Sequence, residues 1–254
     1  MKPIHLLFFA LLVVVLLGGC EPSVPTDAPD TPTAFVDEAE VAAVVNRYVE
    51  QVALQVAAGK QESDALSREV FVQAIAPYVT ELMAGGSPPP FEELHRTVQD
   101  YLARAQGHPE QRFVERMVGH QMLTRVIPYV REPVPDEVKL DYVALMIHGM
   151  STEFPTILSV LENTRGHEAR VRRLAREALV NTWALERIHE ERLEAWKEGL
   201  AALPASFTHR RDVEAALVEM AQSWPPYVEL ADGSSSRGRL DMGSVRTRLA
   251  QLMR

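Results

Sequence analysis

The longest amphipathic stretch of the chain, residues 167–200, reads HEARVRRLAREALVNTWALERIHEERLEAWKEGL. At about 100° per residue, one face of a helix through this stretch collects Val171, Ala178, His189 and Trp196. Charged residues are frequent at the remaining positions, as on the solvated face of a helix. The stretch therefore predicts one long helix over residues 167–200, with His189 in the middle of its apolar face.

The same helical periodicity extends outward in both directions along the chain. It predicts further helices over about 34–57, 64–83, 91–106, 109–130, 136–150, 155–163, 208–223 and 244–253. Proline- and glycine-rich breaks at 85–90 and 132–135 separate them, and Pro77 predicts a kink. Residues 227–230 form the only strand candidate, and residues 233–238 read as a flexible loop. We expect an all-α fold, an irregular multi-helix bundle.

The amino terminus has the layout of an exported protein. A short positive start, Met1-Lys2-Pro3, precedes residues 4–17, which are apolar apart from His5. This is the layout of a secretory signal peptide, and it is too short to span about 30 Å of hydrocarbon as a helix. The sequence predicts a signal peptide over residues 1–19.

The apolar stretch ends Leu17-Gly18-Gly19-Cys20, and Cys20 is the only cysteine in the chain. These four residues resemble the lipobox of the bacterial lipoprotein class. The resemblance implies diacylglyceryl attachment to the Cys20 sulfur, cleavage before Cys20 and an extracytoplasmic protein on a membrane anchor. Glu21 stands where an aspartate tends to retain members of the class in the inner membrane, so the resemblance favours the outer membrane in a cell that has one. With Cys20 lipidated, no thiol remains for a nucleophile, a disulfide or a metal site.

Residues 20–33 join the anchor to the helical body. They carry prolines at 22, 25, 29 and 32, which favour an extended polyproline II linker. We expect a helical domain over residues 34–230 and a basic tail with a short helix over residues 231–254.

Catalytic and cofactor motifs give little support to an enzyme. Gly149-Met150-Ser151-Thr152-Glu153 lacks the last glycine of a nucleophile elbow, and no phosphate-binding glycine loop is present. Glu-x-x-His occurs as Glu92/His95 and Glu186/His189, but helical geometry places Glu92 opposite its apolar face, so the first pair is expected to be solvated. We expect no cofactor, and the net charge of −9 argues against nucleic-acid binding.

Three histidines are predicted to lie at or near apolar helix faces. His189 is central in its stripe, His120 is central among Phe113, Met117, Thr124 and Ile127, and His148 flanks the stripe of Val138, Tyr142 and Leu145. One hypothesis is that His120, His148 and His189, with Glu186, form a buried divalent-metal site. The simpler one is that they are separate core histidines, each hydrogen-bonded to a neighbour.

Basic residues cluster at 165–176 and in the tail from Gly233, while residues 21–64 are acidic. Arg172, Arg173 and Arg176 point away from the apolar stripe, so they predict either a surface for anionic headgroups or an acidic partner. The alternative is an ordinary solvated face, with the basic tail pairing with the acidic amino-terminal region of the same chain.

Three function classes follow. The favoured one is a membrane-anchored helical interaction module that docks on an envelope complex or holds a client protein. A cell-wall hydrolase with two carboxylates about 5 to 10 Å apart is an alternative. A carrier of a lipid or small ligand is the third, and it requires an enclosed apolar cavity larger than about 300 Å³.

Overall fold

Helices make up nearly all of the chain that the structure describes. This computed structural model describes residues 36–59, 65–189, 193–222, 228–229, 235–236 and 241–254, and Pro32–Arg254 form one compact unit. The all-α prediction is confirmed. The single sheet in the described residues pairs two antiparallel strands of two residues, β1 (Val228–Glu229) and β2 (Ser235–Ser236). β1 falls on the strand candidate, and β2 lies where a loop was expected.

The helical elements of the unit, in chain order, include two π-helical segments and one 3-10 turn. They are α1 (Glu38–Ala58), α3 (Ala65–Val70), η2 (π, Phe71–Ile75), α4 (Ala76–Met83), α5 (Phe91–Ala105), α6 (Gln111–Gln121), η3 (π, Met122–Val126), η4 (3-10, Ile127–Tyr129), α7 (Asp136–His148), α8 (Phe154–Asn163), α9 (Glu168–His189), α10 (Leu193–Ala202), α11 (Arg210–Gln222) and α12 (Met242–Leu252).

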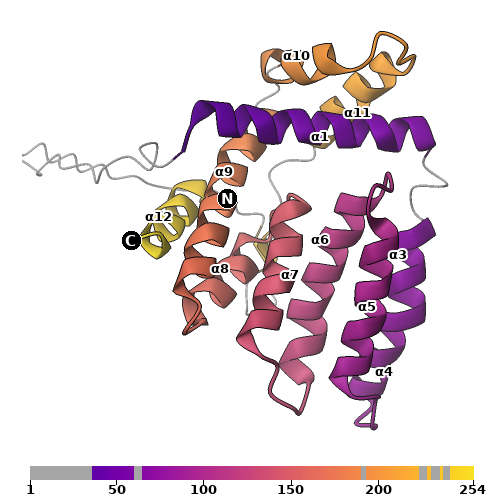
Figure 1. The fold of residues 1–254 in the computed structure, drawn as a ribbon, viewed down its shortest axis with the longest axis vertical. Coiled ribbons are helices and arrows are strands. Elements are labelled where there is room, and N and C mark those ends of the chain that lie inside the picture. The colour runs from indigo at the N-terminus through magenta and orange to yellow at the C-terminus, as the bar shows by residue number, and fades with distance from the viewer. Residues whose placement is uncertain (1–35, 60–64, 190–192, 223–227, 230–234, 237–240) are drawn as a thin grey trace, which may run out of the picture. The chain divides into compact units, whose positions relative to one another are not determined.

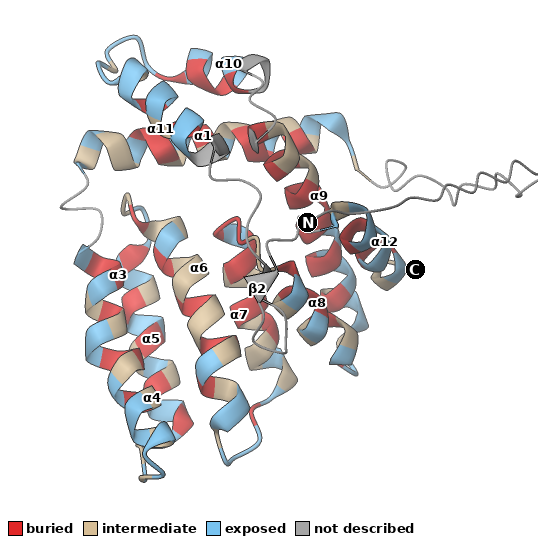
Figure 2. Cartoon of the chain, turned by 180° about the vertical axis from the view of Figure 1, so that it is seen from behind, coloured by how far each residue is buried: buried red, intermediate tan, exposed pale blue. Residues whose placement is uncertain are grey.

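Helices α3 to α9, together with α12, stand side by side in a row (Figure 1). Each contacts the next: α3 and η2 pack on α5, α5 on α6, α6 on α7, α7 on both α8 and α9, and α12 on both α8 and α9. Buried residues gather on the faces where these helices meet (Figure 2). The predicted tail helix is α12, and it packs within the row.

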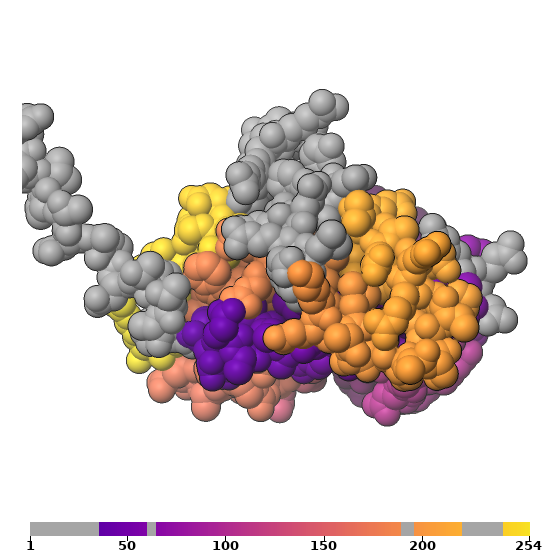
Figure 3. Space-filling model, turned by 90° about the horizontal axis from the view of Figure 1, so that it is seen from above, coloured from indigo at the N-terminus to yellow at the C-terminus, as the bar shows by residue number. Residues whose placement is uncertain are grey.

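Helix α1 crosses one end of this row, and α10 and α11 lie on its other side (Figure 1). Viewed from that end, α1 runs beside the α10–α11 pair (Figure 3). Asp37 begins α1 as a capping box, because its side chain accepts a hydrogen bond from the Ala39 amide and Glu40 reaches back to the Asp37 amide. Contact on both sides of α1 explains why Val49 is fully buried.

The predicted single helix over residues 167–200 is wrong, because two helices occupy this stretch. α9 ends at His189 and α10 begins at Leu193, while residues 190–192 lie outside the described part. No proline or glycine marks the break, so periodicity alone continued the helix. The break lets α10 pack on α1, where Gly199 approaches so closely that a β-carbon there would lie 3.0 Å from the Val49 β-carbon.

The two π-helical segments each stand just before a proline. The Ala76 amide bonds the Phe71 carbonyl ahead of Pro77, and the Ile127 amide bonds the Met122 carbonyl ahead of Pro128. A proline lacks an N–H and clashes with the preceding turn. A π register is a common local adjustment at such points, so the irregularity expected at Pro77 takes this form.

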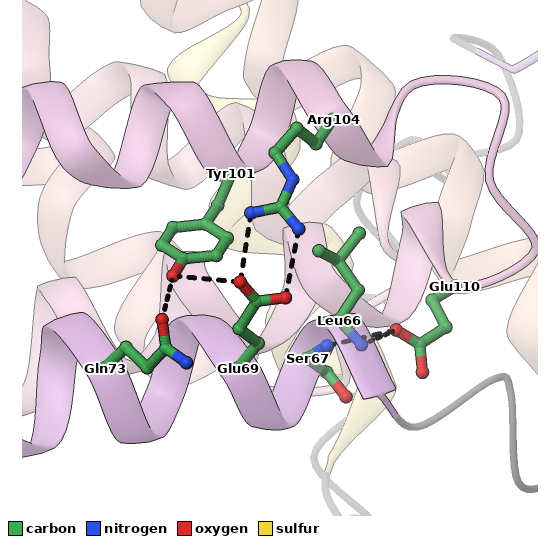
Figure 4. A network of polar contacts seen from close by, with 7 residues as sticks. All are labelled: Leu66, Ser67, Glu69, Gln73, Tyr101, Arg104 and Glu110. Atoms are coloured by element: carbon green, nitrogen blue, oxygen red, sulfur yellow. Dashed lines mark hydrogen bonds and ion pairs between the residues drawn. The ribbon is translucent and has the colours of Figure 1, made fainter.

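Polar contacts hold α3 and η2 against α5 and α6 (Figure 4). Arg104 makes a bidentate pair with Glu69, with nitrogen–oxygen distances of 3.1 and 3.0 Å, and the hydrogen bond from Arg104 holds the pKa of Glu69 below its usual range. Glu110 is fully buried, and its Oε2 accepts hydrogen bonds from the Leu66 and Ser67 amides at 2.9 and 3.0 Å. Glu110 thus caps the first turn of α3 from a distant part of the chain.

Helices α6 and α7 approach closely because a glycine lies at each end of their contact. A β-carbon on Gly119 of α6 would lie 2.6 Å from the Tyr142 carbonyl oxygen of α7. A β-carbon on Gly149, at the end of α7, would lie 2.6 Å from the Arg112 carbonyl oxygen of α6. Real β-carbons do not approach backbone atoms this closely, so both positions require glycine.

We expect Gly119→Ala to destabilise the protein by about 1–3 kcal/mol. Alanine favours a helix by about 1 kcal/mol over glycine, but the clash with a backbone oxygen outweighs this gain because α7 cannot move without breaking its own packing. The free energy of unfolding from urea titration measures the effect.

Gly243→Ala in α12 is the matched control, since this glycine is exposed and its nearest non-neighbouring atom is the flexible Asp241 carboxylate at 3.2 Å. The free energy of unfolding of the Gly243→Ala variant should stay unchanged or rise by up to about 1 kcal/mol. Equal effects of the two substitutions would contradict the close-packing argument.

Candidate functional site

An open cleft of about 740 Å³ lies between α1, α6, the end of α7 and α9. We call it the α1–α6 cleft. Its volume falls within the roughly 300–1,000 Å³ of ligand pockets in proteins. Its walls come from helices far apart in sequence, so only the folded chain forms it.

The end of α7 forms one wall in a strained conformation. The Ser151 amide bonds the Met146 carbonyl at 2.8 Å, which closes the helix as in a Schellman motif. Glycine usually takes the left-handed position of this motif, but here Met150 takes it, with φ of 54°. Gly149 stands one residue earlier, where α6 leaves no room for a side chain. The buried Met150 side chain therefore lines the cleft at a backbone cost of about 1–2 kcal/mol.

Three arginines line the cleft from different helices: Arg47 from α1, Arg112 from α6 and Arg176 from α9. Arg112 donates a hydrogen bond to the His148 carbonyl oxygen at 3.0 Å. The pKa of Arg112 is lowered, first by burial and next by the positive charge of Arg47. Glu115 and Glu50 oppose this with smaller effects on the same pKa.

Another arginine of α6, Arg116, lies one turn along the helix from Arg112. Its guanidinium carbon stands 5.4 Å from the centre of the Phe113 ring, and burial lowers the pKa of Arg116. Tyr48 of α1 lies near both Arg112 and Arg116, and burial raises its own pKa more than the two arginines lower it. Burial therefore acts on two neighbouring arginines of α6, Arg112 and Arg116, at the α1–α6 interface.

The floor of the cleft is apolar, with Val44, Ile147, Met150 and Val180 all buried. Asn181 at its edge donates to the Ile147 carbonyl oxygen at 2.6 Å. An apolar floor below charged walls suits an amphipathic ligand more than a fully polar one.

The histidines of the predicted metal site occupy different surroundings. His120 is half-buried, with Nδ1 buried and without a hydrogen-bond partner among the described residues. His148 is exposed at the end of α7, where it borders the cleft. The side chain of His189 lies outside the described residues. Among the side chains that are described, no group of three or more metal-binding residue types could hold an ion.

The expected apolar faces of α6 and α7 were misplaced, which explains the positions of His120 and His148. On α6 the buried residues are Val114, Val118 and Met122, one position along from the predicted stripe, and Phe113 is 39% exposed. Gly119 must face α7, and this contact rotates the buried face away from Phe113. α7 is buried on two sides by α6, α8 and α9, so a single stripe did not describe it.

His95, expected to be solvated, is half-buried. Its Nδ1 lies 2.7 Å from the Tyr142 hydroxyl oxygen, and its ring stacks on Phe91 with centroids 6.0 Å apart. Glu92 is exposed as expected. His95 is half-buried because it contacts Tyr142 of α7. The spacing of residues along one helix does not reveal such a contact with another helix.

The predicted basic patch is partly neutralised within the protein. Arg172, Arg173 and Arg176 are all exposed on α9. Arg176 pairs with Glu40 of α1 at 2.8 Å, and Arg173 lies 3.8 Å from Glu177. Arg187, further along α9, also pairs with α1 through Glu38. The acidic residues at the start of α1 therefore form ion pairs with basic residues of α9.

The basic tail pairs with α8 and α9 in the described residues. Arg246 of α12 is only 8% exposed, and its guanidinium carbon lies 3.5 Å from the centre of the Trp183 ring. It donates to the Thr182 hydroxyl at 3.1 Å and forms an ion pair with Glu186. Arg248 pairs with Glu162 of α8 at 2.6 Å. Glu186, a candidate metal ligand, is thus a docking residue for α12.

Sequence comparison adds no family to this geometry. The chain matches no protein-family model, and neither curated proteins nor solved structures gave a significant match. None of the described helices is both long and apolar enough to cross a membrane.

We expect Arg246→Ala to lower the free energy of unfolding by about 3 kcal/mol, because it removes a buried cation together with its stacking and hydrogen bonds. Arg248→Ala, two residues away on the same helix, removes an ion pair whose side chains are 44% and 35% exposed. That control should cost at most about 1 kcal/mol. Urea titration of both variants measures their free energies of unfolding. Similar losses of stability in the two variants would show that Arg246 does not dock α12.

Proposed function

We propose that the protein is a membrane-anchored, extracytoplasmic lipoprotein whose helical unit acts as a binding module. Leu17-Gly18-Gly19-Cys20 supports the anchor, and residues 1–35 lie outside the described part, so this half of the proposal rests on sequence. Two or more acyl chains on one cysteine hold far more firmly than a single chain, which binds a membrane only marginally.

The α1–α6 cleft is the observation that carries the binding role. It combines a suitable volume, an apolar floor, charged walls and a residue in a strained conformation, Met150. Strained residues concentrate at sites where the surrounding structure holds a functional shape. The proline-rich linker, at about 3.1 Å per residue, could hold this cleft up to roughly 40 Å from the lipid surface.

The partner of the module is proposed to be a component of the cell envelope, either a docked complex or a held client. The metal alternative used Glu186 as a ligand, and the ion pair with Arg246 already engages that carboxylate. For a ligand carrier, the α1–α6 cleft exceeds roughly 300 Å³, but it is open and has charged walls, so it supports the binding of a small ligand without the enclosed apolar cavity expected of a carrier.

The anchor is tested by radiolabelled palmitate in cells that make the full chain. The natural chain should take up the label and stay with the membrane fraction, whereas Cys20→Ser should lose the label, because serine offers no sulfur for the diacylglyceryl group. Equal labelling of the two chains, or none in either, would rule out the lipid anchor.

The binding role is tested by a photoreactive diazirine side chain in place of Ala43, an exposed residue of the cleft. Irradiation of the full chain in its own membranes should give a discrete adduct at position 43. The same group in place of Ala215, exposed on α11 and outside the cleft, should give none above background. Identical adduct patterns at the two positions would contradict a binding cleft.

A further inference from the structure

Three arginines and three glutamates line the α1–α6 cleft, but of these arginines only Arg176 has an ion-pair partner among the described residues. Within the described residues, neither Arg47 nor Arg112 forms an ion pair. The two side chains lie close enough to repel, since Arg47 lowers the pKa of Arg112. Like charges brought together in a partly dehydrated site are unfavourable unless an anion joins them.

The carboxylates that border the cleft already have partners. Glu40 pairs with Arg176 at 2.8 Å, and Glu115 accepts a hydrogen bond from the Gln111 side-chain amide at 2.9 Å. Glu177 lies 3.8 Å from Arg173. These acids reduce the positive potential at the rim, but none of them lies between Arg47 and Arg112 as an ion-pair partner.

The arginines offer the right donors for a carboxylate. A guanidinium presents five N–H donors in a planar fork that matches the two oxygens of a carboxylate. Arg112 is half-buried and uses one of its terminal nitrogens for the His148 carbonyl, which fixes its position without a charge. Arg47 is exposed on the facing helix and can approach the same anion.

The floor determines what else the ligand carries. Val44, Ile147, Met150 and Val180 are apolar and lie under the arginines in the same cleft. Each methylene buried against such a surface contributes about 0.8 kcal/mol. A bare inorganic anion would leave this floor in contact with water.

We propose that the α1–α6 cleft binds a small organic anion made of a carboxylate and an apolar chain, with the carboxylate between Arg47 and Arg112. The proposal rests on the binding role of the cleft and names its ligand class. It makes the module a sensor of a single-chain amphiphile in the envelope.

Calorimetric titration of three probes tests the ligand class, with the lipidated full chain in lipid nanodiscs and empty nanodiscs as the blank. Hexanoate carries both features, acetate carries only the charge, and 1-hexanol carries only the chain. Hexanoate should bind at least about tenfold more tightly than acetate, because each buried methylene contributes roughly fourfold. It should also bind at least about tenfold more tightly than 1-hexanol, which has no charge for the arginines.

Arginine variants test the geometry. Arg47→Gln and Arg112→Gln should each weaken hexanoate binding by about tenfold or more and leave 1-hexanol unaffected. Arg172→Gln, an exposed arginine of α9 outside the cleft, is the matched control and should change nothing. Arg47 is exposed, so its variant should fold, and circular dichroism checks the helicity of both.

Several results would overturn the ligand class. These are hexanoate binding no tighter than 1-hexanol, hexanoate affinity unchanged in both cleft variants, or no hexanoate binding at all. If hexanoate does not bind but a discrete adduct forms at position 43, the proposed ligand class is wrong and the binding role of the cleft stands. Loss of palmitate labelling would contradict only the proposed lipid anchor.

Discussion

The close contact of α6 with α7 is the constraint on which the rest of the structure depends. Gly119 and Gly149 bring the two backbones together at both ends of the interface, where any side chain would strike a carbonyl oxygen. This contact sets which face of α6 is buried. It also places Arg112 beside the last turn of α7, where the His148 carbonyl holds its guanidinium. The wall of the α1–α6 cleft is therefore a consequence of helix packing.

Helix α1 closes the site by lying across the end of the row. Its two-sided burial, against α9 below and α10 and α11 above, leaves few of its positions free. Arg47 is one of them, and it faces a cleft that already contains Arg112. Ion pairs from Glu38 and Glu40 to α9 fix the other end of α1. The packing of α1 thus keeps Arg47 near Arg112 although their like charges repel.

Charge and burial together separate the structural polar residues from the candidate functional ones. Glu110 caps α3 and Arg246 docks α12, and both have several partners within the protein. Arg47 and Arg112 do not have an ion pair among the described residues. Buried polar groups with partners inside the protein stabilise a fold, whereas partly paired charges in a cleft are available to a ligand.

The sequence alone determined the helical class and most helix positions, because helical periodicity is a local feature. The proposed lipid anchor likewise rests on a local feature, the lipobox. Periodicity did not predict that the stretch over residues 167–200 contributes two helices, α9 and α10, that both pack on α1. The pairing of Arg246 with Glu186 joins residues 60 positions apart, and Arg47 and Arg112 meet across two helices. Spacing along a helix tells which residues share its face but not which neighbour that face meets. For that reason, the tertiary structure alone decided that the predicted histidines occupy different surroundings and that two arginines share a cleft.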